Sequence, residues 1–299
     1  MAQAAGSAPF FFPMTLKELR LAVFGPGLLG GSLLHDARAL GVRELRTWAR
    51  REESLAAVRD LGLTDFAATD AAAVAQGADL LVLCVPVGGM VNLAQQLAAS
   101  QPAAGAVFTD VGSVKGMVMR EVAPVFAAAG FTFIGSHPMA GSEKTGLDAA
   151  RRGLYRDAPC ILTPPPDAPR AALERLHTFW QALGCQTSAM DAAAHDEVVA
   201  RISHLPHAGA VLATLAAFAP DPAAARFGAG GLRDTTRVAS GDAAMWCEIL
   251  LENRAALLPA LQDLRTAASQ FIAALESGDA AALLALLAEA QRLRATRYP

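Results

Sequence analysis

Short apolar runs alternate with amphipathic helical patterns through the first half of the chain. The runs that predict strands cover residues 19–24, 45–48, 79–85, 106–111 and 131–134. Two of them, 79–85 and 106–111, lack polar alternation, which is typical of strands buried on both faces. Helical patterns over 28–40 and 54–61 separate the strands. This alternation predicts a Rossmann-type doubly wound parallel sheet in an α/β domain.

The pattern changes after the PPPDAP segment at residues 164–169, which cannot continue a helix. A short apolar run near Cys185 indicates one more strand, and Ala/Leu-rich patterns predict helices over 169–183, 192–218, 243–275 and 279–295. We therefore divide the chain into a loose N-terminal tail, a Rossmann domain and an all-helical domain, with bounds 1–17, 18–165 and 166–299. Because the helices have broad apolar faces, we expect the helical domain to pair with its copy in a homodimer.

Composition narrows the class of protein. The 299 residues are 53% hydrophobic and 18% charged, with a net charge of −3, which indicates a compact globular chain. The charges are interspersed, so we expect no nucleic-acid partner. The four cysteines, Cys84, Cys160, Cys185 and Cys247, show no paired spacing and lie in apolar runs, which predicts reduced, buried thiols. No run is long enough for a signal peptide or a membrane span, so we expect a cytoplasmic protein without a membrane partner.

A glycine motif, GPGLLG, directly follows the first predicted strand and opens the first helix. Gly25 permits the tight turn, Gly27 lets the backbone approach a pyrophosphate, and Gly30 allows close helix–strand packing. Leu28 and Leu29 begin the helix, whose free amide groups attract phosphates. The motif predicts a dinucleotide site, and the alternative is a glycine turn without a ligand.

The end of the second predicted strand decides between NAD and NADP. An acid that holds the ribose of NAD is expected there, but Ala49 is followed by Arg50 and Arg51. A guanidinium pairs with a 2′-phosphate, so this sequence favours NADP over NAD. In the alternative, both arginines are solvated and Glu52 or Glu53 holds the ribose.

Two further strand ends point toward the same crevice. Cys84, Val85 and Pro86 end the predicted strand at 79–85, and Asp110 ends the one at 106–111, so we count these four among the cofactor contacts. Ser113 follows Asp110, and for both residues helix capping alone is an alternative role. Lys115, two residues further along, is expected to face solvent.

The polar run GSHPMAGSEKTG, residues 135–146, follows the predicted strand at 131–134. Ligands bind beyond the carboxyl ends of strands in open α/β sheets, so a polar loop in this place indicates chemistry. The alternative is a solvated turn, because Gly, Ser, Pro and Thr are common in turns.

The helical part contains two polar islands. Pro206 interrupts a helix between His204 and His207, which predicts a kink with both histidines on one face. The two lack a third ligand at a recognisable spacing, so no metal is expected. The second island, GLRDTTR followed by Met-Trp, carries Arg237, which suits a carboxylate but could also be an ordinary surface arginine.

Taken together, these motifs resemble the prephenate/arogenate (cyclohexadienyl) dehydrogenase family of tyrosine biosynthesis. The resemblance runs from about residue 19 to residue 256 and includes, in order, GPGLLGGS, TDVGSVKG, GSHPMAGSEKTG, ISHLPHA and GLRDTTRVASGDAAMW with LLEN. It implies that His137 accepts the proton of the ring hydroxyl and that Ser113 supports that hydroxyl and the nicotinamide. Among the implied substrate contacts, Arg237 would bind a carboxylate and pair with Glu143. The others are His204, His207, Ser142, Trp246 and Asp234, some of them from a second subunit.

The predicted reaction is the oxidative decarboxylation of prephenate or arogenate, with hydride transfer to NADP or NAD. We expect any inhibition by tyrosine to act at the active site. One alternative is a β-hydroxyacid or imine reductase, but its usual catalytic lysine is missing from the 192–218 helix. The other is a non-catalytic nucleotide sensor, against which the retained histidine, serine and arginine argue.

Overall fold

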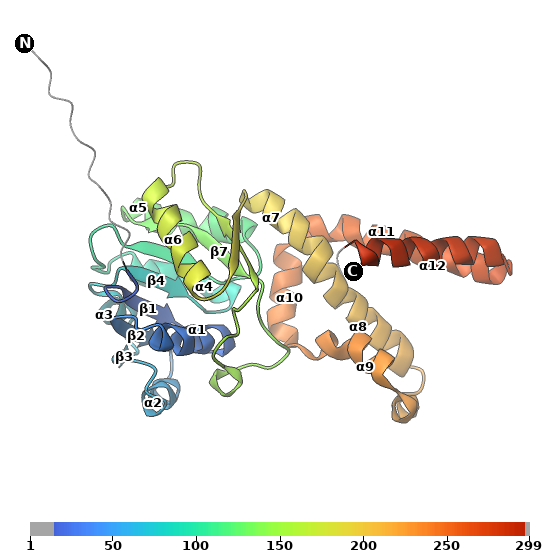
Figure 1. Ribbon diagram of the computed structural model, residues 1–299, viewed down its shortest axis with the longest axis horizontal. Coiled ribbons are helices and arrows are strands. Elements are labelled where there is room, and N and C mark those ends of the chain that lie inside the picture. Colours follow the sequence, from blue (N-terminus) through green and yellow to red (C-terminus); the bar gives the residue numbers. More distant parts are fainter. Residues whose placement is uncertain (1–14, 297–299) are drawn as a thin grey trace, which may run out of the picture.

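A computed structural model describes residues 15–296 (Figure 1). Most of the predicted N-terminal tail lies outside the described residues. The first part of the chain forms two β-sheets covered by helices, and the second part is helical. Helices α11 and α12 run side by side away from the sheets.

The larger sheet has six strands in the order β3-β2-β1-β4-β5-β6. All of its neighbours are parallel, and β1 lies between β2 and β4. This order and direction confirm the predicted doubly wound Rossmann sheet. The strands are β1 (Arg20–Phe24), β2 (Glu44–Trp48), β3 (Phe66–Ala68), β4 (Leu80–Leu83), β5 (Val107–Asp110) and β6 (Thr132–Phe133).

A three-stranded sheet, β7-β8-β9, lies beside the larger one. It consists of β7 (Gly135–Pro138), β8 (Pro159–Thr163) and β9 (Gln186–Ala189). Strand β7 is antiparallel to β8, with His137 opposite Ile161. The prediction that residues 135–146 form a loop is therefore wrong for the first four residues. His137 lies on a strand, whose backbone pairing holds it more firmly than a loop does.

Helices cover both faces of the larger sheet. Leu21 and Val23 belong to one buried apolar cluster, while their neighbours Ala22 and Phe24 belong to the other, so β1 is buried on both sides. The helices of the first part are α1 (Leu28–Ala39), α2 (Glu52–Asp60), α3 (Ala71–Ala75), α4 (Val87–Leu97), the π-helical η1 (Val118–Val122), α5 (Ala123–Ala128), the 3₁₀ turn η2 (Leu147–Ala149) and α6 (Arg170–Ala182).

The segment after the proline run packs with the first part of the chain. Phe179 and Trp180 of α6 are buried in the same cluster as Leu21. Strand β9, which follows Cys185, confirms the extra strand and completes the smaller sheet. The proline run is thus a turn within the first part, and we place the domain boundary near residue 190 instead of 165.

The second part contains α7 (Ala192–Val199), the π-helical η3 (Ala200–His204), α8 (Leu205–Phe218), η4 (Pro222–Phe227), α9 (Gly230–Thr236), η5 (Arg237–Ser240), α10 (Ala243–Glu252), α11 (Arg254–Glu276) and α12 (Ala280–Ala295). None of the helices in residues 15–296 is long and apolar enough to cross a bilayer.

One predicted helix is irregular next to Pro206, where the sequence predicts a kink, and another, predicted as continuous, is broken. The 192–218 pattern contains the π-helical η3, because Pro206 has no N–H for the regular ladder. The 243–275 pattern is interrupted at Asn253, between α10 and α11. The buried Asn253 amide donates to the Asp196 carbonyl at 2.8 Å, a tertiary contact that the local pattern does not reveal.

The prediction of buried cysteines is wrong for one of the four. Cys160 and Cys185 are buried and Cys84 is half-buried, but Cys247 on α10 is exposed. Its helix faces solvent on that side, so the apolar run around Cys247 does not imply burial.

Candidate active site

The glycine turn after β1 has the geometry of a dinucleotide cradle. Gly25 has φ +107°, which disfavours any side chain. A Cβ on Gly30 would lie 2.0 Å from the Gly25 carbonyl oxygen, whereas a Cβ on Gly27 would meet nothing within 4 Å. Gly27 therefore borders open space at the start of α1, next to the half-buried Leu28 and Leu29. The residues present fit a bound pyrophosphate.

The end of β2 carries exposed positive charge. Arg50 and Arg51 are both exposed, and Arg51 is the N-cap residue of α2. Glu52 forms an ion pair with Arg59, so its carboxylate is already engaged. Within residues 15–296, neither Arg50 nor Arg51 has an ion-pair partner of its own.

The other two strand ends differ in accessibility. At the end of β4, Cys84 and Val85 are half-buried, and the exposed Pro86 is the N-cap of α4. Burial raises the pKa of the Cys84 thiol, so it stays protonated. At the end of β5, Asp110 is fully buried and its Oδ1 accepts the Ser136 N–H at 3.1 Å. Asp110 is therefore engaged within the protein, and the prediction that it contacts the cofactor is not supported by this geometry.

Lys115 is completely buried, which corrects the expectation that it faces solvent. Its Nζ lies 2.5 Å from Asp110 Oδ2 and also donates to the Gly112 carbonyl at 2.8 Å. Burial of the cation is possible because a carboxylate and carbonyl groups replace its water. The pair holds the turn that presents the half-buried Ser113.

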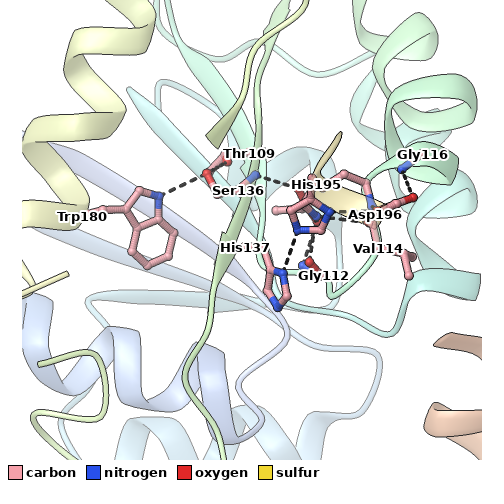
Figure 2. Close-up of polar contacts among 11 residues, drawn as sticks. Thr109, Gly112, Val114, Gly116, Ser136, His137, Trp180, His195 and Asp196 are labelled. Carbon is pink, nitrogen blue, oxygen red and sulfur yellow. Dashed lines mark hydrogen bonds and ion pairs between the residues drawn. The ribbon is translucent and has the colours of Figure 1, made fainter. Parts of the chain in front are cut away.

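His137 is the first member of a hydrogen-bonded chain that crosses between the two parts of the molecule (Figure 2). Its Nδ1 lies 2.8 Å from Nε2 of His195, a fully buried residue on α7. The Nδ1 of His195 in turn lies 2.8 Å from Oδ1 of Asp196. The two oxygens of Asp196 accept the backbone N–H groups of Lys115 and Gly116, each at 2.8 Å.

Burial sets the charge state of this chain. It lowers the pKa of His137 well below the ordinary value, and the nearby Lys115 cation lowers it further. Burial also lowers the pKa of His195, although Asp196 opposes that shift. Burial alone would raise the pKa of Asp196, but its hydrogen bonds from His195 and two backbone amides lower it overall. The chain at neutral pH is thus two neutral imidazoles ending in a carboxylate.

His204 and His207 both lie against the ring of Trp246. The rings of His207 and Trp246 stack with centroids 3.5 Å apart and an angle of 9°. Asn253 Nδ2 lies 3.0 Å from His204 Nδ1 and donates to it, which leaves the proton of His204 on Nε2. Two buried atoms, His204 Nε2 and His207 Nδ1, have no partner with good hydrogen-bond geometry in the described part of the chain, although the backbone of Ser113 lies close to His204. Burial lowers the pKa of His204 to about 4, so its ring is neutral.

Arg237 on η5 and Glu143, in the segment after β7, form an ion pair between the two parts of the molecule. Arg237 Nη1 lies 2.7 Å from Glu143 Oε2, so the pair that the resemblance implies does form. The hydrogen bond of Glu143 with its own backbone amide and the contact with Arg237 lower the pKa of that carboxyl. Ser142 is exposed, and its Oγ accepts the Lys144 N–H at 3.2 Å. Asp234, on the exposed face of α9, lies beside Arg233 and is not brought into this cluster.

Four residues of the site were not identified from the sequence: Lys115, His195, Asp196 and Asn253. Only His195 and Asp196 leave a trace in the pattern, because with Glu197 they form a run of three ionisable residues on an otherwise apolar helix. The role of Asn253 depends on partners distant in sequence, Asp196 and His204, whereas that of Lys115 depends on the folded turn that brings it against Asp110.

Comparisons with known proteins agree with this geometry. Residues 43–189 match the family model described as prephenate dehydrogenase, nucleotide-binding domain, and residues 191–289 match prephenate dehydrogenase, dimerization domain. The chain is 33% identical over 279 residues to the cyclohexadienyl dehydrogenase of Zymomonas mobilis, covering 92% of this chain and 94% of that protein.

Solved structures are also similar over nearly the whole chain. A prephenate dehydrogenase of Aquifex aeolicus, in complex with hydroxyphenyl propionate and NAD+, superposes with a TM-score of 0.84 at 27% identity, covering 95% of this chain and 99% of that one. The arogenate dehydrogenase of Synechocystis gives a TM-score of 0.78 at 29% identity, with coverage of 93% and 100%. The chain therefore belongs to the prephenate dehydrogenase family.

Proposed function

We propose that this protein is a dehydrogenase that oxidatively decarboxylates prephenate or arogenate, with hydride transfer to a nicotinamide dinucleotide. The observation that carries the proposal is the state of His137. Its Nδ1 is engaged by His195, its pKa is lowered, and its Nε2 makes no hydrogen bond within residues 15–296. A neutral imidazole with one free nitrogen is suited to accept a hydroxyl proton.

The reaction uses His137 as a temporary base. The hydroxyl proton of the substrate moves to Nε2 of His137 while the carbinol carbon loses its hydride, which the nicotinamide accepts when bound. Loss of the ring carboxylate as carbon dioxide leaves its electron pair in the ring, which becomes aromatic as a phenolate. The phenolate oxygen then takes the proton back from His137, so the residue ends as it began. Ser113, on the turn held by Lys115, supports the same hydroxyl.

Substrate binding involves groups of both parts of the molecule. Arg237 binds the side-chain carboxylate of the substrate, because a cation on the ring carboxylate would oppose its departure. The fully buried His204 packs edge-on against Trp246, and His207, whose ring stacks on the same Trp246, lines the substrate site. Ser142 and Glu143 border it from the first part, and Asp234 borders the site of a second subunit.

We further propose that the cofactor is NADP in preference to NAD. The exposed guanidinium groups of Arg50 and Arg51, at the end of β2, suit a 2′-phosphate, and Ala49 leaves no acid for a ribose hydroxyl. Of the two acids that could hold the ribose instead, Glu52 and Glu53, the first is already paired with Arg59.

A homodimer through the helical part is the assembly we propose. The match to a dimerization domain supports it, as does the apolar surface of α12, none of whose residues is buried in the single chain. In a twofold-symmetric dimer this face of α12 would meet its copy on the other subunit, so the same leucines would be buried in both subunits.

The proposal is tested by initial rates with prephenate and arogenate, each with NAD and with NADP. Turnover is expected in at least one combination, and the rate at low cofactor concentration should be higher with NADP. His137→Asn is expected to lower kcat by about 100- to 10,000-fold while cofactor binding, measured by fluorescence titration, is retained. Absence of turnover in all four combinations would overturn the proposal.

A further inference from the structure

We propose that His195 and Asp196 are positioning residues that fix the tautomer of His137 and take up part of the charge it gains. The inference rests on the proposed function, since it concerns the base of that reaction. Neither residue touches the opening where substrate binds: His195 is fully buried, and the Asp196 carboxylate is engaged by protein groups.

Asp196 is the fixed end of the chain. Its two oxygens accept three hydrogen bonds, from His195 Nδ1 and from the amides of Lys115 and Gly116, all at 2.8 Å. Its backbone carbonyl accepts a fourth, from Asn253. A Cβ at position 116 would lie 2.6 Å from Asp196 Oδ2, so glycine is required for this close approach. A carboxylate that accepts this many donors stays ionised and in place.

An ionised Asp196 determines where every proton of the chain lies. The carboxylate only accepts, so Nδ1 of His195 carries the hydrogen and its Nε2, in the neutral ring, has a lone pair. Because that lone pair faces Nδ1 of His137 at 2.8 Å, the hydrogen of His137 lies on Nδ1. Nε2 of His137 is then the bare nitrogen, which is the form a base needs.

The same chain accounts for the charge that appears during the reaction. The buried Lys115 cation disfavours a second positive charge on His137. As the substrate O–H bond breaks and a bond forms at His137 Nε2, the hydrogen on His137 Nδ1 moves toward His195 Nε2. The positive charge then lies on His195, directly against its counter-ion Asp196. The steps reverse when the phenolate recovers its proton, so no proton is lost to solvent.

The chain also joins the two parts of the molecule. His137 lies on β7, whereas His195 and Asp196 lie on α7, and Asp196 reaches back to the amides at positions 115 and 116 (Figure 2). The base is therefore in its reactive tautomer only when the two parts are docked.

Two substitutions of His195 separate its two tasks. His195→Leu removes both nitrogens at similar volume, and we expect kcat to fall about 100-fold or more with KM changed less than threefold. His195→Gln offers a carbonyl oxygen to His137 but cannot carry a proton, so we expect an intermediate fall of about 10-fold. Both should shift the pH dependence of kcat. The matched control is His177→Gln, on a half-buried histidine of α6 that bonds Thr187, with kcat expected within twofold.

A readout independent of turnover is the tautomer itself. In protein labelled with ¹⁵N-histidine, His137 Nδ1 should resonate as a protonated nitrogen and Nε2 as a bare one, and His195→Leu should mix the two forms. The six histidines of the chain can be assigned by single substitutions. Wild-type kcat and pH profile in His195→Leu, or in His195→Gln if the leucine variant does not fold, would overturn the inference. So would an unchanged tautomer in the leucine variant. Failure of the proposed function differs from these results, because the wild type itself would not turn over.

Discussion

The two parts of this molecule bury their apolar side chains to very different extents. In the first part, strands β1 and β4 are almost completely buried, and two apolar clusters fill the space on either side of the sheet. In the second part, α12 has no buried residue and α11 has three. The apolar residues left exposed there include Ile202, Leu212, Leu215, Leu258, Phe271, Ile272, Leu275, Leu284, Leu287 and Leu293.

The two parts therefore differ in whether a single chain can bury their apolar side chains. The first part has a core of its own in one chain, whereas the second part leaves many large apolar side chains exposed on its helices. The two parts are joined by polar contacts, among them the His137–His195–Asp196 chain and the Arg237–Glu143 pair, and by Ile249 of α10, which is buried in a cluster of the first part. The predictions below test each side of the contrast.

The largest effect is expected from a charge on the surface of α12. Leu284 is 67% exposed, and a twofold dimer that buries it does so in both subunits. Leu284→Asp should weaken dimerisation by about 1,000-fold or more, since two leucine contacts of roughly 2 kcal/mol each are lost. Sedimentation velocity over a range of protein concentrations measures this. The matched control is Leu61→Asp, on the first part, where the leucine is 56% exposed and no change of mass is expected. Equal mass distributions for both variants would show that this face of α12 is not the interface.

A second prediction concerns His204, a fully buried histidine of the second part. The pKa of His204 is about 4 in the folded protein and 6.5 as its ordinary value, so between these values the unfolded chain binds more protons. Stability is thus fully present above about pH 6.5 and is lost as the pH falls toward 4, by about 3 kcal/mol from this residue. Urea unfolding at fixed protein concentration, between pH 7 and pH 5, measures the slope. His204→Gln should reduce that slope, and an identical slope in the variant would contradict the prediction.

Arg237, which pairs with Glu143 of the first part, provides a third test. Arg237→Ala removes a charged hydrogen bond to the substrate carboxylate and should raise KM for the substrate by about 10- to 100-fold. The turnover number at saturation should change less than threefold, because the contact is equally present in the ground state. Steady-state kinetics separates the two constants. Arg226→Ala, on the exposed η4 segment, serves as the control, with KM unchanged. A loss confined to kcat would contradict the binding role.

The first part could be predicted further from sequence than the site could. The turn from Gly25 to Gly30 is a local pattern. A Cβ on Gly30 would clash with the Gly25 carbonyl, and one on Gly25 would clash with Cys84 at the end of the adjacent strand. The chain behind His137 has no such pattern, because His195 lies 58 residues away and on the other part of the molecule. Lys115 was misplaced for a related reason. A lysine is ordinarily exposed, and only the folded turn brings it against Asp110.

The helix break at Asn253 is another feature that the local sequence pattern does not predict. The apolar periodicity continues from α10 into α11, so the sequence predicts a single helix. The side chain of Asn253 bonds the Asp196 carbonyl and the His204 ring instead, and the chain turns there. Tertiary contacts outweigh the helical preference of the segment.

The smallest effect is expected where α10 touches the first part. Glu248, an exposed residue of α10, accepts the Gly88 N–H at 3.3 Å, at the beginning of α4. A carboxylate near a helix N-terminus stabilises it modestly, so Glu248→Ala should lower the free energy of unfolding by about 0.5 kcal/mol. Urea unfolding with Glu197→Ala, an exposed glutamate of α7, as the control measures the difference. Since a Cβ at position 88 would come within 3.2 Å of the Glu248 carboxylate, Gly88→Ala should remove most of the same contact. If combining Gly88→Ala with Glu248→Ala cost the sum of the two single losses, the residues would be acting independently and this contact would not join the two parts.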